Sequence, residues 1–127
     1  EAFTEFAATC GLWLLRGHGL WTAEARGSGA VQGFVLIGFE PGDREPELGF
    51  LFLPEAEGQG LAHEASRAVQ AQARALGLPS LVSYVDAANT RSVALALRLG
   101  ARRDPAAEAA IHHDCHVYRH FGPEFSA

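Results

Sequence analysis

The chain has 127 residues, 48% of them hydrophobic, and a formal net charge of −5, which indicates one globular domain with a buried core. The excess of acidic over basic residues argues against a nucleic-acid-binding protein, and the longest apolar run, residues 34–39, is too short to span a bilayer. Two cysteines and no recognisable secretion signal are typical of a reduced, cytoplasmic protein.

The first half of the sequence predicts a helix followed by three strands. From Glu1 to Arg16 the apolar side chains recur at helical spacing, and glycines beginning at Gly17 end the helix. Residues 41–46 are rich in turn formers and predict a loop between the second and third strands. The three strands are expected over Leu20–Ala25, Ala30–Phe39 and Glu47–Leu53.

After Pro54 the pattern changes to two helices that alternate with two strands. Leu61 to Leu76 is an alanine-rich stretch of strong helix formers, and Gly77 ends it. Asn89 is placed to cap a second helix that continues to Gly100. Strands are expected over Ser80–Asp86 and Cys115–Phe121. This order of elements predicts a mixed α/β layer fold.

The segment between the third strand and the next helix contains two glycines, Gly58 and Gly60. The first turn of a helix has unpaired N–H groups, and glycines before it let the backbone approach an anion. This pattern predicts a phosphate or pyrophosphate site, although a plain strand-to-helix turn is the alternative. The segment lacks the Gly-Lys-Ser/Thr of a nucleoside triphosphate loop and the third glycine of a dinucleotide-binding loop.

Short motifs accompany this loop in one order along the chain. They are Glu47-Leu48-Gly49-Phe50, Pro54-Glu55-x-x-Gly58-x-Gly60-x-Ala62-x-Glu64-Ala65, Leu76-Gly77-Leu78, Asn89-x-x-Ser92 and Leu99-Gly100-Ala101. Over residues 19–121 the set resembles the GNAT superfamily, and within it the Rim-type branch, which includes acetyltransferases acting on ribosomal-protein N-termini. The resemblance implies an α/β (α+β) fold with a mixed, mostly antiparallel sheet flanked by helices. It also implies that strands 47–53 and 80–86 splay apart to leave a cleft.

The resemblance further implies that acetyl-coenzyme A (acetyl-CoA) is the co-substrate and binds in this cleft. Backbone groups of Leu51, Phe52 and Leu53 would pair with the pantetheine arm like an added strand. Asn89 would reach the same arm with its side chain, although an N-cap role explains an asparagine at this position in any fold. The backbone amides expected to hold the pyrophosphate are those of Gly58, Gln59, Gly60, Leu61 and Ala62.

The implied reaction is direct attack of a primary amine on acetyl-CoA while both substrates are aligned in one cleft. Many members carry a tyrosine general acid seven residues after the asparagine, but this chain has Ala96 there. In the Rim-type branch a serine three residues after the asparagine takes this role, which makes Ser92 the candidate. Glu47 is the candidate general base, with a solvated strand-end acid as the alternative. Glu55 stands where the family often has Arg or Gln.

The stretch His112-His113-Asp114-Cys115-His116 raises the question of a metal site. On a strand these potential ligands are divided between two faces, and their spacing lacks the paired pattern of zinc sites. We therefore expect no metal. No motif surrounds Cys115, which argues against a nucleophilic role. Trp21 lies on the strand that faces the acceptor in the Rim-type branch, although core packing is the simpler interpretation.

Two other interpretations stay open beside an N-acetyltransferase. The missing tyrosine is compatible with a non-catalytic acyl-CoA-binding module derived from the GNAT fold, and an interaction or structural fragment is the third possibility. The acceptor is an amine that the sequence does not identify, either a protein N-terminus or a small molecule such as an aminoglycoside or a polyamine.

The family's sheet normally begins with a strand and a helix upstream of the helix that starts at Glu1. We therefore expect residues 1–127 to be a single GNAT domain that lacks this N-terminal unit. The strand at Leu20–Ala25 would then have a free edge, and exposed edges recruit other strands. We therefore expect either a homodimer across this edge or a lower stability than that of the full domain.

Overall fold

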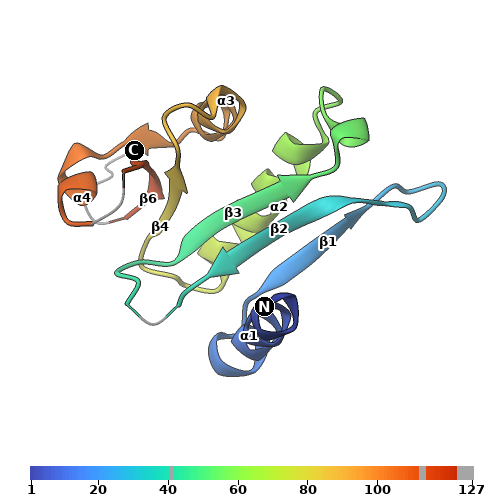
Figure 1. The fold of residues 1–127 in the computed structure, drawn as a ribbon, viewed down its shortest axis with the longest axis horizontal. Helices are drawn as coiled ribbons and strands as arrows, with labels where there is room; N and C mark the ends of the chain where they lie inside the picture. Colours follow the sequence, from blue (N-terminus) through green and yellow to red (C-terminus); the bar gives the residue numbers. More distant parts are fainter. Residues whose placement is uncertain (41, 112–113, 123–127) are drawn as a thin grey trace.

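The computed structural model describes residues 1–40, 42–111 and 114–122. Six strands form one sheet in the order β1-β2-β3-β4-β6-β5 (Figure 1). They are β1 Leu20–Glu24, β2 Val31–Gly38, β3 Glu47–Phe52, β4 Leu81–Val85, β5 Arg102–Arg103 and β6 His116–Phe121. The helices are α1 Ala2–Arg16, α2 Leu61–Ala75, α3 Thr90–Arg98 and α4 Pro105–Ala109, with a short 3-10 helix η1 at Pro54–Ala56.

The pairing of the strands confirms a mixed, mostly antiparallel sheet. Among the strands described, only β3 and β4 are parallel neighbours, and they share a single paired position, Glu47 with Val82. By contrast, β2 and β3 are paired at six positions. Figure 1 shows β3 and β4 diverging from this point. The predicted splay is therefore present, and it divides the sheet into two halves that are joined mainly at one end.

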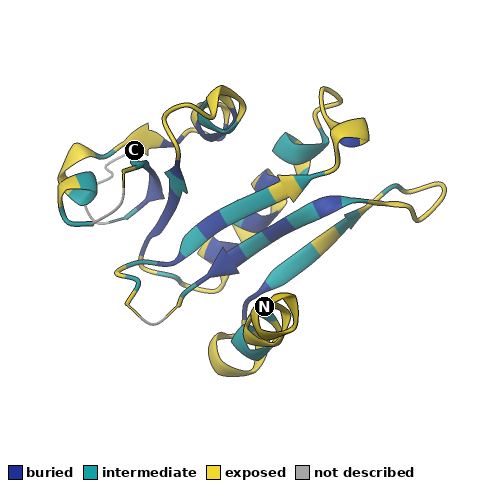
Figure 2. Ribbon diagram, in the orientation of Figure 1, coloured by how far each residue is buried: buried dark blue, intermediate teal, exposed yellow. Residues whose placement is uncertain are grey.

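The main core lies between the sheet and α2. Alternate side chains of β2 and β3 point toward α2, whose buried Val69 and Ala73 face them. A smaller cluster forms where α3 packs on β4 and β6, and it consists of Val85, Ala96, Ala101 and Tyr118. Figure 2 shows the buried residues along the central strands and on the inner faces of these helices. The main core reaches both halves of the sheet, because Leu81 of β4 and Phe121 of β6 belong to it, whereas the smaller cluster is confined to the second half.

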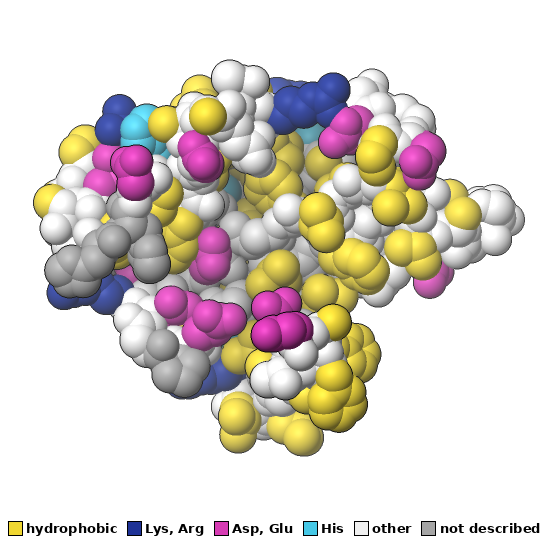
Figure 3. All heavy atoms as spheres, in the orientation of Figure 1, with side chains coloured by type: hydrophobic (Ala, Val, Ile, Leu, Met, Phe, Trp, Pro, Cys, Tyr) yellow, Lys and Arg dark blue, Asp and Glu magenta, His cyan; other side chains and the backbone are white. Residues whose placement is uncertain are grey.

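Helix α1 is present as predicted, and Gly17 ends it in the left-handed conformation with φ 76°. Its apolar side chains, however, are exposed, including Phe3 at 82% and Leu14 at 91%. Hydrophobic side chains gather visibly over this helix (Figure 3). Its main anchor is Trp13, whose ring meets Trp21 edge-on with centroids 4.8 Å apart. Trp21 itself packs against the main core, as the simpler interpretation predicted.

Strand β5 and helix α4 were not predicted. Both are too short for a periodic pattern, with two and five residues. Local signals for α4 are nevertheless present, because Asp104 caps it through a hydrogen bond from the Ala107 amide (3.0 Å) and Pro105 occupies its first turn. Among the helices described, none is long and apolar enough to cross a membrane.

Candidate functional site

A cleft of about 610 Å³ lies where β3 and β4 separate. Its walls come from the end of β3, from the segment that leads into α2 and the first residues of this helix, and from one side of α3. The lining residues include Phe50, Phe52, Gly58, Gly60, Leu61, Ala62, Asn89 and Ser92. The structure thus brings together most of the candidate residues from three separate parts of the sequence.

The glycine loop has the backbone that the sequence predicted. Gly58 and Gly60 have φ angles of 79° and 74°, in the left-handed region that favours glycine, and Gly60 is the N-cap residue of α2. Among the described residues, no side chain caps this helix, so its first amides remain available to an anion. Gln59 is directed elsewhere, because its side-chain amide donates to the Glu55 carbonyl (3.0 Å) and it does not line the cleft.

The free edge of β3 consists of different residues from those expected. The Leu53 amide donates to the Gln32 carbonyl of the neighbouring strand (2.9 Å), and Leu51 is paired with Phe34. Because backbone groups alternate between the two sides of a strand, those of Phe50 and Phe52 point toward β4 and the cleft. The backbone groups of Leu51 and Leu53 thus point toward β2, although Leu51 also lines the cleft, and of the three expected residues Phe52 presents its backbone to the opening.

On α3, Asn89 and Ser92 lie together at the start of the helix. The side-chain oxygen of Asn89 accepts a hydrogen bond from the Ser92 amide (3.1 Å), which is the N-cap geometry. Ser92 is half-buried and lines the cleft. Ala96 is fully buried in the smaller core and does not line the cleft.

Sequence analysis missed two arginines of α3 that line the cleft, Arg91 and Arg98. Arg91 forms an ion pair with Glu57 of the glycine loop, which joins the two walls at the surface. An arginine two residues after a helix-capping asparagine is the signal that could have identified it, because this position lies on the first turn beside the loop. These two cations and the α2 amides add positive potential to a chain that is acidic overall.

Glu47 lies at the paired end of β3, five residues before Phe52, and therefore roughly 16 Å along the strand from it. It does not line the cleft itself. Burial raises the pKa of its carboxyl to about 7, while interaction with the backbone amide of Tyr84 opposes this effect. The negative charges of Asp43 and Glu40 are smaller contributions to the same rise in pKa. A carboxyl with a pKa near neutrality is suited to general base catalysis.

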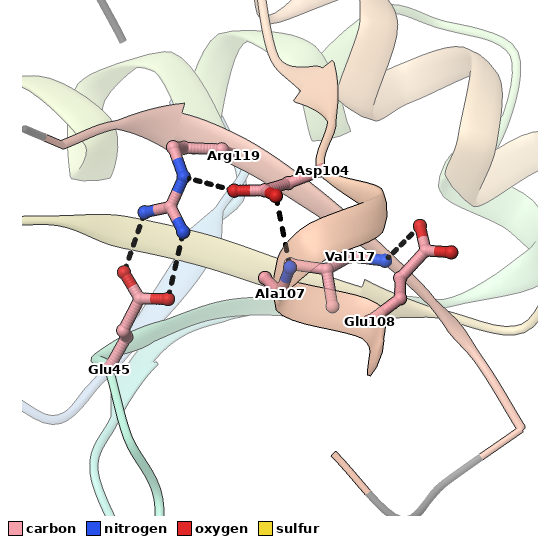
Figure 4. A network of polar contacts seen from close by, with 6 residues as sticks. All are labelled: Glu45, Asp104, Ala107, Glu108, Val117 and Arg119. Carbon is pink, nitrogen blue, oxygen red and sulfur yellow. Dashed lines mark hydrogen bonds and ion pairs between the residues drawn. The ribbon is translucent and has the colours of Figure 1, made fainter. Parts of the chain in front are cut away.

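Close to Glu47, a group of charged residues joins the second half of the sheet to the loop before β3 (Figure 4). Arg119 of β6 donates to both carboxylate oxygens of Glu45 (2.6 and 3.0 Å) and to Asp104 (2.7 Å). Asp104 is also the cap of α4. With Tyr84, these residues line a second cavity of about 390 Å³. The pKa of Glu45 is lowered by its hydrogen bonds with Arg119, so it stays ionised.

The candidate metal stretch is only partly visible. His112 and His113 lie outside the described residues, and no group of three or more potential ligands occurs among those that are described. Burial raises the pKa of the Cys115 thiol, and nearby carboxylates raise it further. A protonated thiol is a weak nucleophile, which agrees with the sequence-based expectation for this residue.

Comparison with known proteins places these features in a family. Residues 1–102 match the model of the acetyltransferase (GNAT) domain. The structure of an acetyltransferase from Agrobacterium tumefaciens is 35% identical over 92% of this chain and 68% of its own length, with a TM-score of 0.85. A Vibrio cholerae protein described as a ribosomal-protein-serine acetyltransferase is 25% identical over 97% and 74% of the two chains, with a TM-score of 0.72.

A further structure shares the fold and contains a ligand. It is that of yncA from Salmonella typhimurium, described as an acetyltransferase, with its cofactor acetyl-CoA. It is 20% identical to this chain over 94% of it and 71% of its own length, with a TM-score of 0.69.

Proposed function

This chain belongs to the acetyltransferase (GNAT) family, and we propose that it transfers an acetyl group from acetyl-CoA to a primary amine by direct attack. The observation that carries the proposal is the cleft of about 610 Å³ at the splayed strands. It combines the uncapped start of α2 with an unpaired strand edge, and these two features suit a pyrophosphate and an amide-containing arm.

The residues that would hold the co-substrate follow from these two features. The amides from Gly58 to Ala62 would bind the pyrophosphate, and Arg91 and Arg98 would add charge at the rim. The backbone of Phe50 and Phe52 would pair with the pantetheine arm in the place of a missing strand. Asn89 would contribute mainly by holding the first turn of α3 in place.

The chemistry needs two proton transfers. The amine nitrogen attacks the thioester carbonyl carbon, the carbon–sulfur bond breaks, and the departing thiolate takes a proton. We assign this proton to the Ser92 hydroxyl, which lines the cleft and then regains a proton from solvent, while Glu47 releases one to solvent. Glu47 would accept the proton that the amine loses, directly or through water, because its pKa of about 7 allows it to be a base at neutral pH.

The acceptor is proposed to enter on the Glu47 side of the sheet. The carboxylates of Glu40 and Asp43 near Glu47 favour a cationic acceptor. The resemblance to a protein described as a ribosomal-protein acetyltransferase supports a protein N-terminus as the first candidate, ahead of a small amine. We also propose a cytoplasmic location, supported by two free cysteines, and a homodimer through the edge strand β1.

Two measurements test the proposed function. Calorimetric titration with coenzyme A should show one site, and acetyl-CoA consumption should depend on an amine from a panel of N-terminal peptides, polyamines and aminoglycosides. Binding without transfer to any amine would favour the alternative, a non-catalytic acyl-CoA-binding module, whose support is the buried Ala96 in place of a tyrosine. No binding would refute both. Light scattering tests the dimer, which a monomer at high concentration would rule out.

A further inference from the structure

The pairing of β3 with β4 stops abruptly after one position. The Val82 amide donates to the Pro46 carbonyl (3.1 Å), as in a parallel ladder. One step further, the same ladder would bring the Tyr84 amide to the Leu48 carbonyl. The Leu48 carbonyl instead accepts a hydrogen bond from the side-chain hydroxyl of Ser83 (2.6 Å). A side chain thus occupies the acceptor that would continue the ladder.

The Ser83 hydroxyl belongs to a chain of hydrogen bonds with a single direction. The Gln70 side-chain nitrogen donates to the Leu99 carbonyl (3.2 Å) and contacts Nδ1 of His120 (3.0 Å). An amide nitrogen only donates, so His120 Nδ1 is the acceptor and Nε2 carries the proton. Nε2–H then donates to the Ser83 oxygen (2.8 Å), whose own hydrogen is directed to Leu48.

This series of hydrogen bonds is buried, and its donors and acceptors keep their roles near pH 7. Ser83 and His120 are each 2% exposed. Burial, with a smaller contribution from the charge of Arg74 on α2, lowers the pKa of His120 to about 4, so the ring stays neutral near pH 7. A neutral ring holds one proton, and Gln70 determines which nitrogen carries it. The result is an ordered hydroxyl at the point where the strands part.

From this arrangement we infer that Ser83 is a positioning residue: its hydroxyl, oriented by His120 and Gln70, occupies the Leu48 carbonyl and ends the β3–β4 ladder there. The Tyr84 amide is then left to interact with the carboxylate of Glu47. The inference rests on the proposed function, because it matters for catalysis only if Glu47 is the base. Ser83 itself contacts neither substrate in this scheme. It acts by holding two strands at the separation that keeps the cleft open and Glu47 in place.

Loss of the hydroxyl should change the surroundings of Glu47 in a defined direction. The Leu48 carbonyl would then be free to accept the Tyr84 amide, and Glu47 would lose its favourable contact with that amide. The other titratable groups near Glu47 are Glu40 and Asp43 from the loop before β3, the Tyr84 phenol and the Cys115 thiol. None of these stabilises a carboxylate, so the apparent pKa of Glu47 should rise.

The test compares Ser83→Ala with Ser83→Thr, which keeps a hydroxyl. Ser66→Ala is the matched control, because Ser66 is also fully buried and its hydroxyl has no hydrogen-bond partner among the described residues. The acid limb of the pH profile of kcat/KM should move upward by about half a pH unit or more in Ser83→Ala and return in Ser83→Thr. It should not move in Ser66→Ala. A loss of stability alone would not move this limb.

A second readout does not depend on activity. In the wild-type protein, the NMR shift of the Tyr84 amide should titrate with the Glu47 carboxyl, and in Ser83→Ala this titration should disappear as the amide becomes protected from exchange. If the alanine variant does not fold, Ser83→Cys, with a weak donor of similar size, should move both readouts in the same direction.

The outcomes separate the two proposals. A wild-type protein that neither binds coenzyme A nor transfers acetyl groups would refute the proposed function. The NMR titration of the Tyr84 amide would still test the role of Ser83 in that case. If the NMR shift of the Tyr84 amide does not change as Glu47 titrates in the wild type, the positioning role is overturned. An unchanged acid limb in both Ser83→Ala and Ser83→Cys would do the same.

Discussion

The two ends of the opening between β3 and β4 are built from different kinds of groups. At the paired end, side chains carry the interactions: Glu47 is desolvated, Ser83 occupies the Leu48 carbonyl, and Arg119 joins Glu45 to Asp104. At the open end, backbone amides and glycines carry them, and Leu51 is 70% exposed. From this difference we expect cofactor affinity to depend mainly on backbone conformation, and reactivity and stability to depend on side chains.

The largest effect is expected from Glu47→Gln at the paired end. Removal of a general base should lower kcat by about 10²- to 10⁴-fold, while the affinity for coenzyme A stays the same, because Glu47 does not line the cleft. Steady-state kinetics and calorimetric titration measure the two quantities. If the variant loses affinity for coenzyme A as well as turnover, cofactor binding and reactivity are not divided between the two ends as proposed.

The pH dependence provides the control for this variant. Wild-type kcat/KM should rise with pH through about 7 as Glu47 loses its proton. Its pKa is higher in the folded than in the unfolded state, so its contribution to stability is present below about 4.5 and is lost as the pH rises through about 7. Glu47→Gln should therefore be more stable than the wild type at pH 8. Equal stability at that pH would argue against a buried carboxylate.

The next largest effect concerns stability rather than catalysis. Arg119→Met leaves Glu45 and Asp104 partly buried without their partner, and the free energy of unfolding should fall by about 2–3 kcal/mol. Urea denaturation measures this change. Arg103→Met is the matched control: Arg103 also forms an ion pair, with Glu108, but it is exposed, so its loss should have a much smaller effect. Similar losses in both variants would show that burial does not distinguish the two pairs.

At the open end, Gly60→Val should weaken coenzyme A binding by about tenfold or more, and the strain at its positive φ should also lower the stability of the free protein. Gly60 has φ 74°, and a β-branched residue there either distorts the start of α2 or adds strain. No atom lies within 4 Å of the position that its Cβ would take, so the substitution causes no clash in the free protein. Calorimetric titration of the variant and the wild type measures the affinity for coenzyme A. An unchanged dissociation constant would show that the loop does not contribute to the binding site.

The smallest effect is expected for Ser92→Ala. This residue lines the cleft, but its predicted effect is on turnover, as at the paired end. If its hydroxyl protonates the thiolate, kcat should fall by about tenfold while the Michaelis constant for acetyl-CoA changes little. The fold should be retained, since the Ser92 backbone amide, not its side chain, bonds to Asn89. Equal turnover in the variant would assign the proton to water or to another group.

Much of the fold and of the open end could be predicted from the sequence, because the signals are local. Helical spacing, the cap at Asn89 and the glycines at positions 58 and 60 each depend on a few neighbouring residues, and all appear in the structure. Their order along the chain also indicated the family, which the comparisons confirm. By contrast, β5 and α4 were missed because they are too short to show a periodic pattern.

The paired end was decided by tertiary structure alone. Arg119 and Glu45 are 74 positions apart in sequence, and Ser83 and Leu48 are 35 positions apart, so no local sequence pattern predicts either contact. The register between β2 and β3 likewise determines that Phe50 and Phe52, rather than Leu51 and Leu53, present their backbone to the cleft. The sequence by itself nominated Glu47 through family resemblance, but its pKa of about 7 arises from desolvation, which exists only once distant residues pack around the carboxyl.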